Sequence, residues 1–139
     1  MNVNLIRMTP ADRISELLGL PEEINDRASL ECAVAKGLPA SSVDNILNVM
    51  HAVPNLNLIA ERALRRAKAE KQPLSPAKSR TLYDLARAYV VADKFYSGNG
   101  ILVMRFLEKP NPDLGGATPL SMAITSPAGA DAVIGVLEG

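Results

Sequence analysis

"LSPAKSRTLYDLARAYVVADKFY", residues 74–96, decides the fold class of this chain. Its apolar residues recur three and four positions apart, as at Leu82 and Leu85, whereas a half-buried strand would alternate at every second position. The pair Ser75-Pro76 supplies a hydroxyl that can cap a helix and a residue whose missing N–H costs nothing in the first turn. The pattern predicts one long amphipathic helix over residues 76–96.

The same start signal marks three further helices, at Thr9-Pro10, Thr118-Pro119 and Ser126-Pro127. Apolar residues keep their helical spacing through most of the chain, and no segment alternates convincingly in the manner of a strand. We predict an all-α fold with helices over residues 10–18, 29–36, 40–51, 56–71, 76–96, 100–108, 118–124 and 127–137. Two prolines and a cap in "EKQPLSP" predict a joint between two domains, residues 1–72 and 73–139.

Composition excludes several classes of protein. The chain has 139 residues with 15 basic and 15 acidic side chains, enough for one ordinary domain or two very small ones. Its single cysteine, Cys32, cannot form an internal disulfide, and its single histidine, His51, leaves no cluster for a metal site or a catalytic triad. We expect no metal, no cofactor and no enzymatic activity, because no set of acid, base and nucleophile can be named.

No apolar run reaches the ~18 residues of a membrane-spanning helix, and residues 1–10 lack a signal-peptide pattern, so we expect a cytoplasmic protein.

A first candidate site lies in "SLECAVAKGLPASSVDNILNVM", residues 29–50, whose spacing resembles a helix-turn-helix. The small residue Ala33 allows two helices to approach closely, and Gly37 supplies the corner between them. In the DNA-binding interpretation, the second helix presents polar side chains to the major groove, namely Ser41, Ser42, Asn45 and Asn48. None of these is basic, and the neighbouring Asp44 would repel phosphate. The alternative is a helical corner whose polar face meets only solvent.

A second candidate is the basic run "ERALRRAKAEK", residues 61–71. Residues 61–80 carry seven basic and two acidic side chains, a local charge of +5 between two mildly acidic segments. Phosphate contacts would come from four of these side chains, Arg62, Arg65, Arg66 and Lys68. The alternative is a solvated helix face, because Glu61 and Arg65 form a favourable pair one turn apart.

The run "LGGATP", residues 114–119, raises the question of a phosphate-binding loop. A Walker-type loop needs a lysine before its Ser or Thr and a strand leading into it, and this run has neither. Gly115 and Gly116 can instead take backbone angles that are closed to other residues, after which Thr118-Pro119 starts a new helix. The run therefore predicts a tight corner that either presents a surface to another protein or only turns the chain.

The stretch "LEKPNPDLGGATPLSMAITSPAGADAVIGVL", residues 107–137, resembles the C-terminal toxin-binding domain of Xre/MbcA/ParS-type antitoxins. Residues 74–96 are similar to the helix that opens this domain, and residues 29–71 resemble the family more loosely. Phe106 stands where the family usually has a tryptophan. The resemblance is carried by Phe106-Leu107, Pro110-Asn111, Leu114-Gly115-Gly116, Thr118-Pro119-Leu120, Thr125, Gly129-Ala130 and Val133.

This resemblance implies an antitoxin, not itself an enzyme, that binds a RES-domain toxin. Such toxins use NAD, either by degrading it or by transferring its ADP-ribose to a target. Members of the family are also expected to form homodimers and to repress their own operon through the helix-turn-helix. The residues that the resemblance assigns to toxin binding are Leu114, Gly115, Gly116, Thr118, Pro119, Leu120, Val133, Val136, Leu137, Glu138 and Gly139.

We hypothesise that the last two helices dock on the toxin and bring "VIGVLEG", residues 133–139, to the mouth of its NAD pocket. A pocket that binds a pyrophosphate must offer positive groups, and Glu138 with the Gly139 carboxylate places two negative charges at the end of this chain. A second hypothesis is a DNA-binding transcription factor whose C-terminal half only dimerises.

Overall fold

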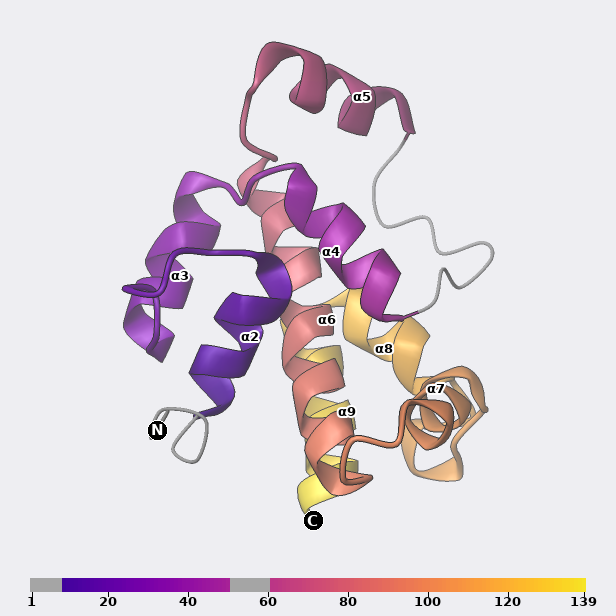
Figure 1. Ribbon diagram of the computed structural model, residues 1–139. Coiled ribbons are helices and arrows are strands. Elements are labelled where there is room, and N and C mark those ends of the chain that lie inside the picture. The colour runs from indigo at the N-terminus through magenta and orange to yellow at the C-terminus, as the bar shows by residue number, and fades with distance from the viewer. Residues whose placement is uncertain (1–8, 51–60) are drawn as a thin grey trace.

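The computed structural model describes residues 9–50 and 61–139, with only the backbone described at residues 61–64. Within these ranges every regular element is helical, so the predicted all-α fold is confirmed. Figure 1 shows the long helix α6 in the middle of the molecule, with α2 to α4 on one side of it and α8 and α9 on the other. The elements are α2 (Pro10–Leu18), α3 (Arg27–Lys36), α4 (Ser41–Val49), α5 (Glu61–Glu70), α6 (Pro76–Phe95), α7 (Gly100–Glu108), the 3-10 turn η1 (Pro112–Leu114), α8 (Pro119–Thr125) and α9 (Pro127–Glu138).

Four of these helices begin at the Ser/Thr-Pro pairs, as predicted. In each one the hydroxyl of the cap residue accepts a hydrogen bond from the backbone N–H three residues later, which satisfies one of the donors that a helix start leaves open. The cap residues are Thr9, Ser75, Thr118 and Ser126. Helix α3 starts two residues before its predicted position because Asp26 and Ser29 form a reciprocal capping box there.

Helix α6 is the element on which the others pack. It contacts α2, α3, α4, α7, α8 and α9. Its buried residues include Leu82, Leu85 and Ala92 of the predicted stripe. The buried apolar side chains of the described residues form one cluster that includes residues from both sides of position 72, for example Leu38 and Leu74. The boundary between residues 72 and 73 stays a prediction.

A short backbone bridge fixes the corner between α3 and α4 on the start of α6. The Leu74 N–H donates to the Leu38 carbonyl at 2.8 Å, and the Leu38 N–H donates to the buried Ser79 hydroxyl at 2.7 Å. Gly37 has a φ of 106°, and a Cβ at this position would collide with the Leu74 carbonyl. The predicted glycine corner is therefore present, and here glycine is needed both for its backbone angle and for the close approach of a second chain segment.

The remaining helix boundaries differ from the predictions by only one or two residues, except where the prediction runs beyond the described residues. Helix α4 covers residues 41–49 of the predicted 40–51. Helix α5 starts at Glu61, and the first five residues of its prediction, 56–60, lie outside the described residues. No helix in the described part of the chain is long and apolar enough to span a bilayer.

Candidate functional site

The predicted corner at Gly115 and Gly116 is a closed loop. The Asn111 N–H donates to the Ala117 carbonyl at 3.0 Å, and the Gly116 N–H donates back to the Asn111 carbonyl at 3.0 Å. Both glycines have positive φ angles, 67° and 88°, and both are exposed. A Cβ at either position would meet no neighbouring atom. The glycines are therefore required by the backbone angles of the turn and not by close packing.

Helices α8 and α9 pack tightly because Gly129 lies at their contact. A Cβ on Gly129 would collide with the Met122 carbonyl of α8. The same residue donates its N–H to the Ser126 hydroxyl at 2.9 Å, which caps α9. Gly129 thus sets both the start of α9 and its distance from α8.

The structure divides the residues assigned to toxin binding into three groups. Five of them are buried, namely Leu114, Pro119, Leu120, Val133 and Leu137. Thr118 and Val136 are half-buried, and Thr118 is used as a cap. Four are exposed: Gly115 and Gly116 at the corner, and Glu138 and Gly139 at the end of α9. Helical periodicity marks the buried residues as apolar without saying that their face packs on the protein's own core. The assignment of all these residues to toxin binding stays a prediction.

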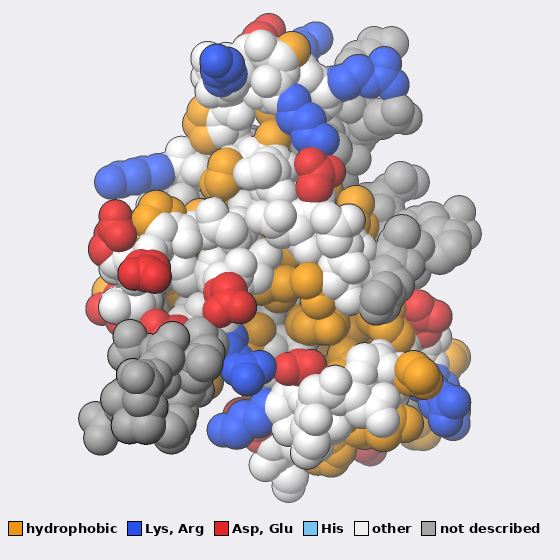
Figure 2. All heavy atoms as spheres, viewed as in Figure 1, with side chains coloured by type: hydrophobic (Ala, Val, Ile, Leu, Met, Phe, Trp, Pro, Cys, Tyr) orange, Lys and Arg blue, Asp and Glu red, His pale blue; other side chains and the backbone are white. Residues whose placement is uncertain are grey.

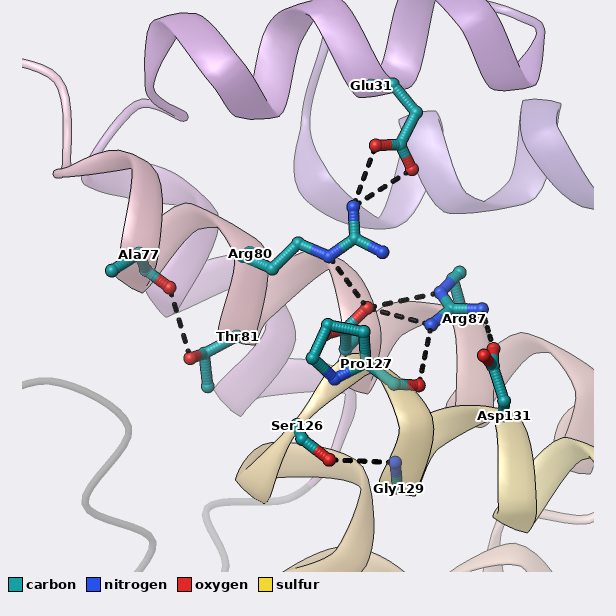
Figure 3. Close-up of polar contacts among 10 residues, drawn as sticks. Glu31, Ala77, Arg80, Thr81, Arg87, Ser126, Pro127, Gly129 and Asp131 are labelled. Carbon is teal, nitrogen blue, oxygen red and sulfur yellow. Dashed lines mark hydrogen bonds and ion pairs between the residues drawn. The ribbon is translucent and has the colours of Figure 1, made fainter.

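A chain of charged side chains connects α3, α6 and α9 (Figure 3). Arg80 donates from its Nη1 to the Glu31 carboxylate of α3 at 2.7 Å and 3.0 Å. The Asp84 carboxylate, 2% exposed, lies between two guanidinium groups, 3.3 Å from Arg80 Nε and 2.9 Å from Arg87 Nη2. Arg87 Nη1 then reaches Asp131 of α9 at 2.8 Å. These charged side chains of α6 thus form an internal contact surface with α3 and α9.

Arg87 holds the first turn of α9 on α6. Besides Asp131, it donates to the Pro127 carbonyl at 3.4 Å. The hydrogen bond from Arg87 lowers the pKa of Asp131 below its ordinary value of 3.8. Between the two arginines, the buried Tyr83 ring lies 5.2 Å from the Arg80 guanidinium carbon and 5.5 Å from that of Arg87. Such contacts favour a cation over the ring face, so the ring helps to keep both guanidinium groups in place.

The loop at the glycine corner, the tight α8–α9 pair and the exposed end of α9 together make up the C-terminal part of the fold. Residues 96–139 match the antitoxin Xre/MbcA/ParS C-terminal toxin-binding domain family. The match supports an antitoxin role and a toxin as partner, and it covers α7, η1, α8 and α9. All of α6, which the sequence resemblance included, lies before the match. No curated protein matches the chain.

The candidate DNA-reading residues on α4 have different surroundings from one another. Ser42 is fully buried and donates its hydroxyl to the Leu18 carbonyl at 2.6 Å, so in this arrangement it packs α4 on α2 and cannot reach a base. Ser41 and Asn48 are exposed, and Asn45 is half-buried against Gly19. A hydroxyl on a helix gives no sequence signal for which side it faces. The assignment of these α4 residues to DNA binding stays a prediction.

Asn45 and Asn48 line a groove of about 690 Å³ between α2, α4 and α6. Its rim includes the carboxylates of Glu16 and Asp93, and Asp93 pairs with Arg13 at 3.0 Å. These carboxylates oppose the approach of a phosphate backbone to this side of α4.

Basic side chains gather at the α5 end of the molecule, at the top of Figure 2. Arg65, Arg66 and Lys68 are exposed there, whereas the Arg62 side chain lies outside the described residues. Lys68 forms an ion pair with Asp44 of α4 at 2.8 Å, so one of the four candidate phosphate contacts is directed to the protein's own acidic group. Within the described residues, no group of His, Cys, Asp and Glu side chains could hold a metal ion; His51 is outside them.

Sequence reasoning missed two features of this part of the fold. The sequence pattern did not predict the ion pair between Arg87 and Asp131, and it gave no role to the exposed Ile101. A usable signal was present for the second feature. The run "ILVMRFL", residues 101–107, is apolar almost all round, and a helix of this kind on one side of a small core must leave some apolar side chains outside it.

Proposed function

We propose that this chain is an antitoxin that binds a cognate RES-domain toxin and blocks the toxin's NAD pocket with its C-terminal segment. The observation that carries the proposal is the match of residues 96–139 to a toxin-binding domain family, in a fold that leaves Glu138 and Gly139 exposed at the end of α9. The negative charge of the exposed Glu138 suits a pocket that must attract a pyrophosphate. As part of the same proposal, the chain forms homodimers, represses its own operon and acts in the cytoplasm.

The buried position of Leu137 determines how the blocking step is tested. Removing residues 136–139 would also remove this core side chain, so loss of binding would have two explanations. Glu138→Lys reverses one terminal charge and leaves the core intact, because Glu138 is exposed. Glu108→Lys is the matched control, since Glu108 is an exposed residue at the last position of α7.

We expect Glu138→Lys to weaken toxin neutralisation about 10-fold or more, measured as growth rescue and as inhibition of NAD turnover, by analogy with charge pairs at interfaces. Glu108→Lys should retain the wild-type effect. Equal neutralisation by the two variants would show that the end of α9 does not enter the pocket, and toxin binding would then have to lie elsewhere on the matched domain.

Operator binding is the second activity that we propose, and the basic α5 end supports it. A gel-shift titration on the chain's own promoter should show weaker binding by the double variant Arg65→Ala, Arg66→Ala. The slope of log binding constant against log salt concentration should also be shallower by about one to two units. The matched control is the double variant Lys94→Ala, Arg105→Ala. It removes the same amount of charge from exposed sites near the other end of α6. DNA binding reduced to the same extent in both variants would reflect net charge alone and would contradict an operator site at α5.

The alternative, a transcription factor whose C-terminal half only dimerises, predicts a different pair of results. Operator binding would depend on α5, but the chain would neither bind nor inhibit a RES-domain protein.

A further inference from the structure

The corner between α6 and α7 exposes two large apolar side chains. Phe95 is 57% exposed at the end of α6, and Ile101 is 74% exposed in the first turn of α7. Among the described residues, the only other large apolar side chain in the exposed class is Val49, at 39%. Figure 2 shows apolar side chains gathered over the α7 region at its lower right. Burying such side chains against a partner is favourable, which makes this corner a candidate interface.

The corner is held in one conformation. The Gly98 N–H donates to the Asp93 carbonyl at 2.8 Å, and the Asn99 side chain caps α7 by accepting from the Leu102 N–H at 3.2 Å. Phe95 packs edge-on against Tyr96, with ring centroids 4.8 Å apart, and Tyr96 continues the contact to Phe106 at 6.1 Å. The backbone that carries both side chains is therefore fixed, and the Phe95 ring is also held by Tyr96. A group that is fixed before binding loses little conformational entropy on binding, which favours this corner as an anchor.

The corner lies at the same end of the molecule as the C-terminus. Helices α6 and α9 pack together and run in the same direction, and Arg87 of α6 contacts Pro127 at the start of α9 (Figure 1). At about 1.5 Å per residue, Phe95 lies roughly 12 Å beyond Arg87, and Glu138 lies roughly 16 Å beyond Pro127. A partner that receives the end of α9 therefore approaches the end of the molecule where Phe95 and Ile101 are exposed.

We infer that Phe95 and Ile101 are apolar anchors for the toxin, next to the C-terminal segment. This inference rests on the proposed function.

Three observations favour the toxin over a second copy of the chain as the occupant. The match to a toxin-binding domain begins at Tyr96, next to Phe95, and includes Ile101. Five of the residues that the resemblance assigns to toxin binding are buried and offer little apolar surface to a partner, whereas Phe95 and Ile101 offer much more. The corner also lies at the same end of the molecule as the exposed end of α9, and the exposed Lys94, next to Phe95, and Arg105, one turn from Ile101, add the polar rim that interfaces have.

Binding of the wild-type chain and of three single variants to one toxin tests this inference. The variants are Phe95→Ser and Ile101→Ser at the corner, and Val49→Ser as the matched control on α4, far from the C-terminus in the sequence. The probe is the cognate RES-domain toxin of the proposed function, inactivated in its NAD site, and affinity is measured by calorimetry. Thermal unfolding of each variant checks the fold, and sedimentation velocity reports the oligomeric state.

We expect Ile101→Ser and Phe95→Ser each to weaken toxin binding about 10-fold or more, as hot-spot truncations do, and Val49→Ser to change it less than about 2-fold. Wild-type affinity in both corner variants would overturn the inference while leaving the proposed function standing. If the corner variants instead convert a dimer to a monomer and keep their affinity for the toxin, the corner is a homodimer interface and the inference is wrong. Absence of binding by the wild-type chain would overturn both the proposed function and this inference.

Discussion

At the scale of single residues, Gly129 and Gly135 show how one helix uses two glycines differently. Both lie in α9, but a Cβ on Gly129 would collide with the Met122 carbonyl of α8, whereas a Cβ on Gly135 would meet nothing. Alanine is favoured over glycine within a helix by up to about 1 kcal/mol. Whether replacing each glycine with alanine stabilises the helix therefore depends on the atoms around that residue.

Gly129→Ala should lower the free energy of unfolding by roughly 1–3 kcal/mol, because the added methyl group forces α8 and α9 apart. Gly135→Ala should leave the free energy unchanged or raise it by up to about 1 kcal/mol. Urea unfolding of the two variants beside the wild-type chain measures both effects. Equal stability of the two variants would contradict the close α8–α9 contact.

At the scale of elements, the start of α9 is held on α6 by the contacts of Arg87 with Asp131 and with the Pro127 carbonyl. Because the folded chain lowers the pKa of Asp131, the unfolded chain binds its proton more readily. This pairing therefore stabilises the fold above pH 3.8, and its contribution is lost as the pH falls below that value through the lower pKa of the folded state.

Carboxyl chemical shifts measured during an acid titration should place the Asp131 midpoint below 3.8 in the wild-type chain. Replacing Arg87 with Gln should move this midpoint upward, since the main cause of the lowered pKa is the hydrogen bond from Arg87. An unchanged Asp131 midpoint in the Arg87→Gln variant would show that the pairing is absent in solution.

The helices were more predictable than the surfaces they present. Ser/Thr-Pro caps act locally, so the starts of four helices follow from adjacent residues such as Ser75 and Pro76. The burial of Val133 and Ser42, by contrast, depends on which helix packs against each face, and that is decided by residues far away in the sequence. The same reason hid the exposure of Ile101, which is apolar in the sequence and has no partner helix over it in the fold.

At the scale of the whole molecule, the two proposed activities lie at opposite ends. The basic helix α5 is at one end, and the C-terminus with the α6–α7 corner is at the other (Figures 1 and 2). Helix α6 extends between them and carries the charged residues that contact both α3 and α9. This separation allows one chain to occupy an operator and a toxin at the same time.

The proposed function is tested most directly by NAD turnover of a purified candidate RES-domain toxin, measured while the purified wild-type chain is added. We expect turnover to fall in proportion to the added chain and to stop at a fixed stoichiometric ratio. Undiminished turnover in a large excess of correctly folded chain would contradict the proposed function.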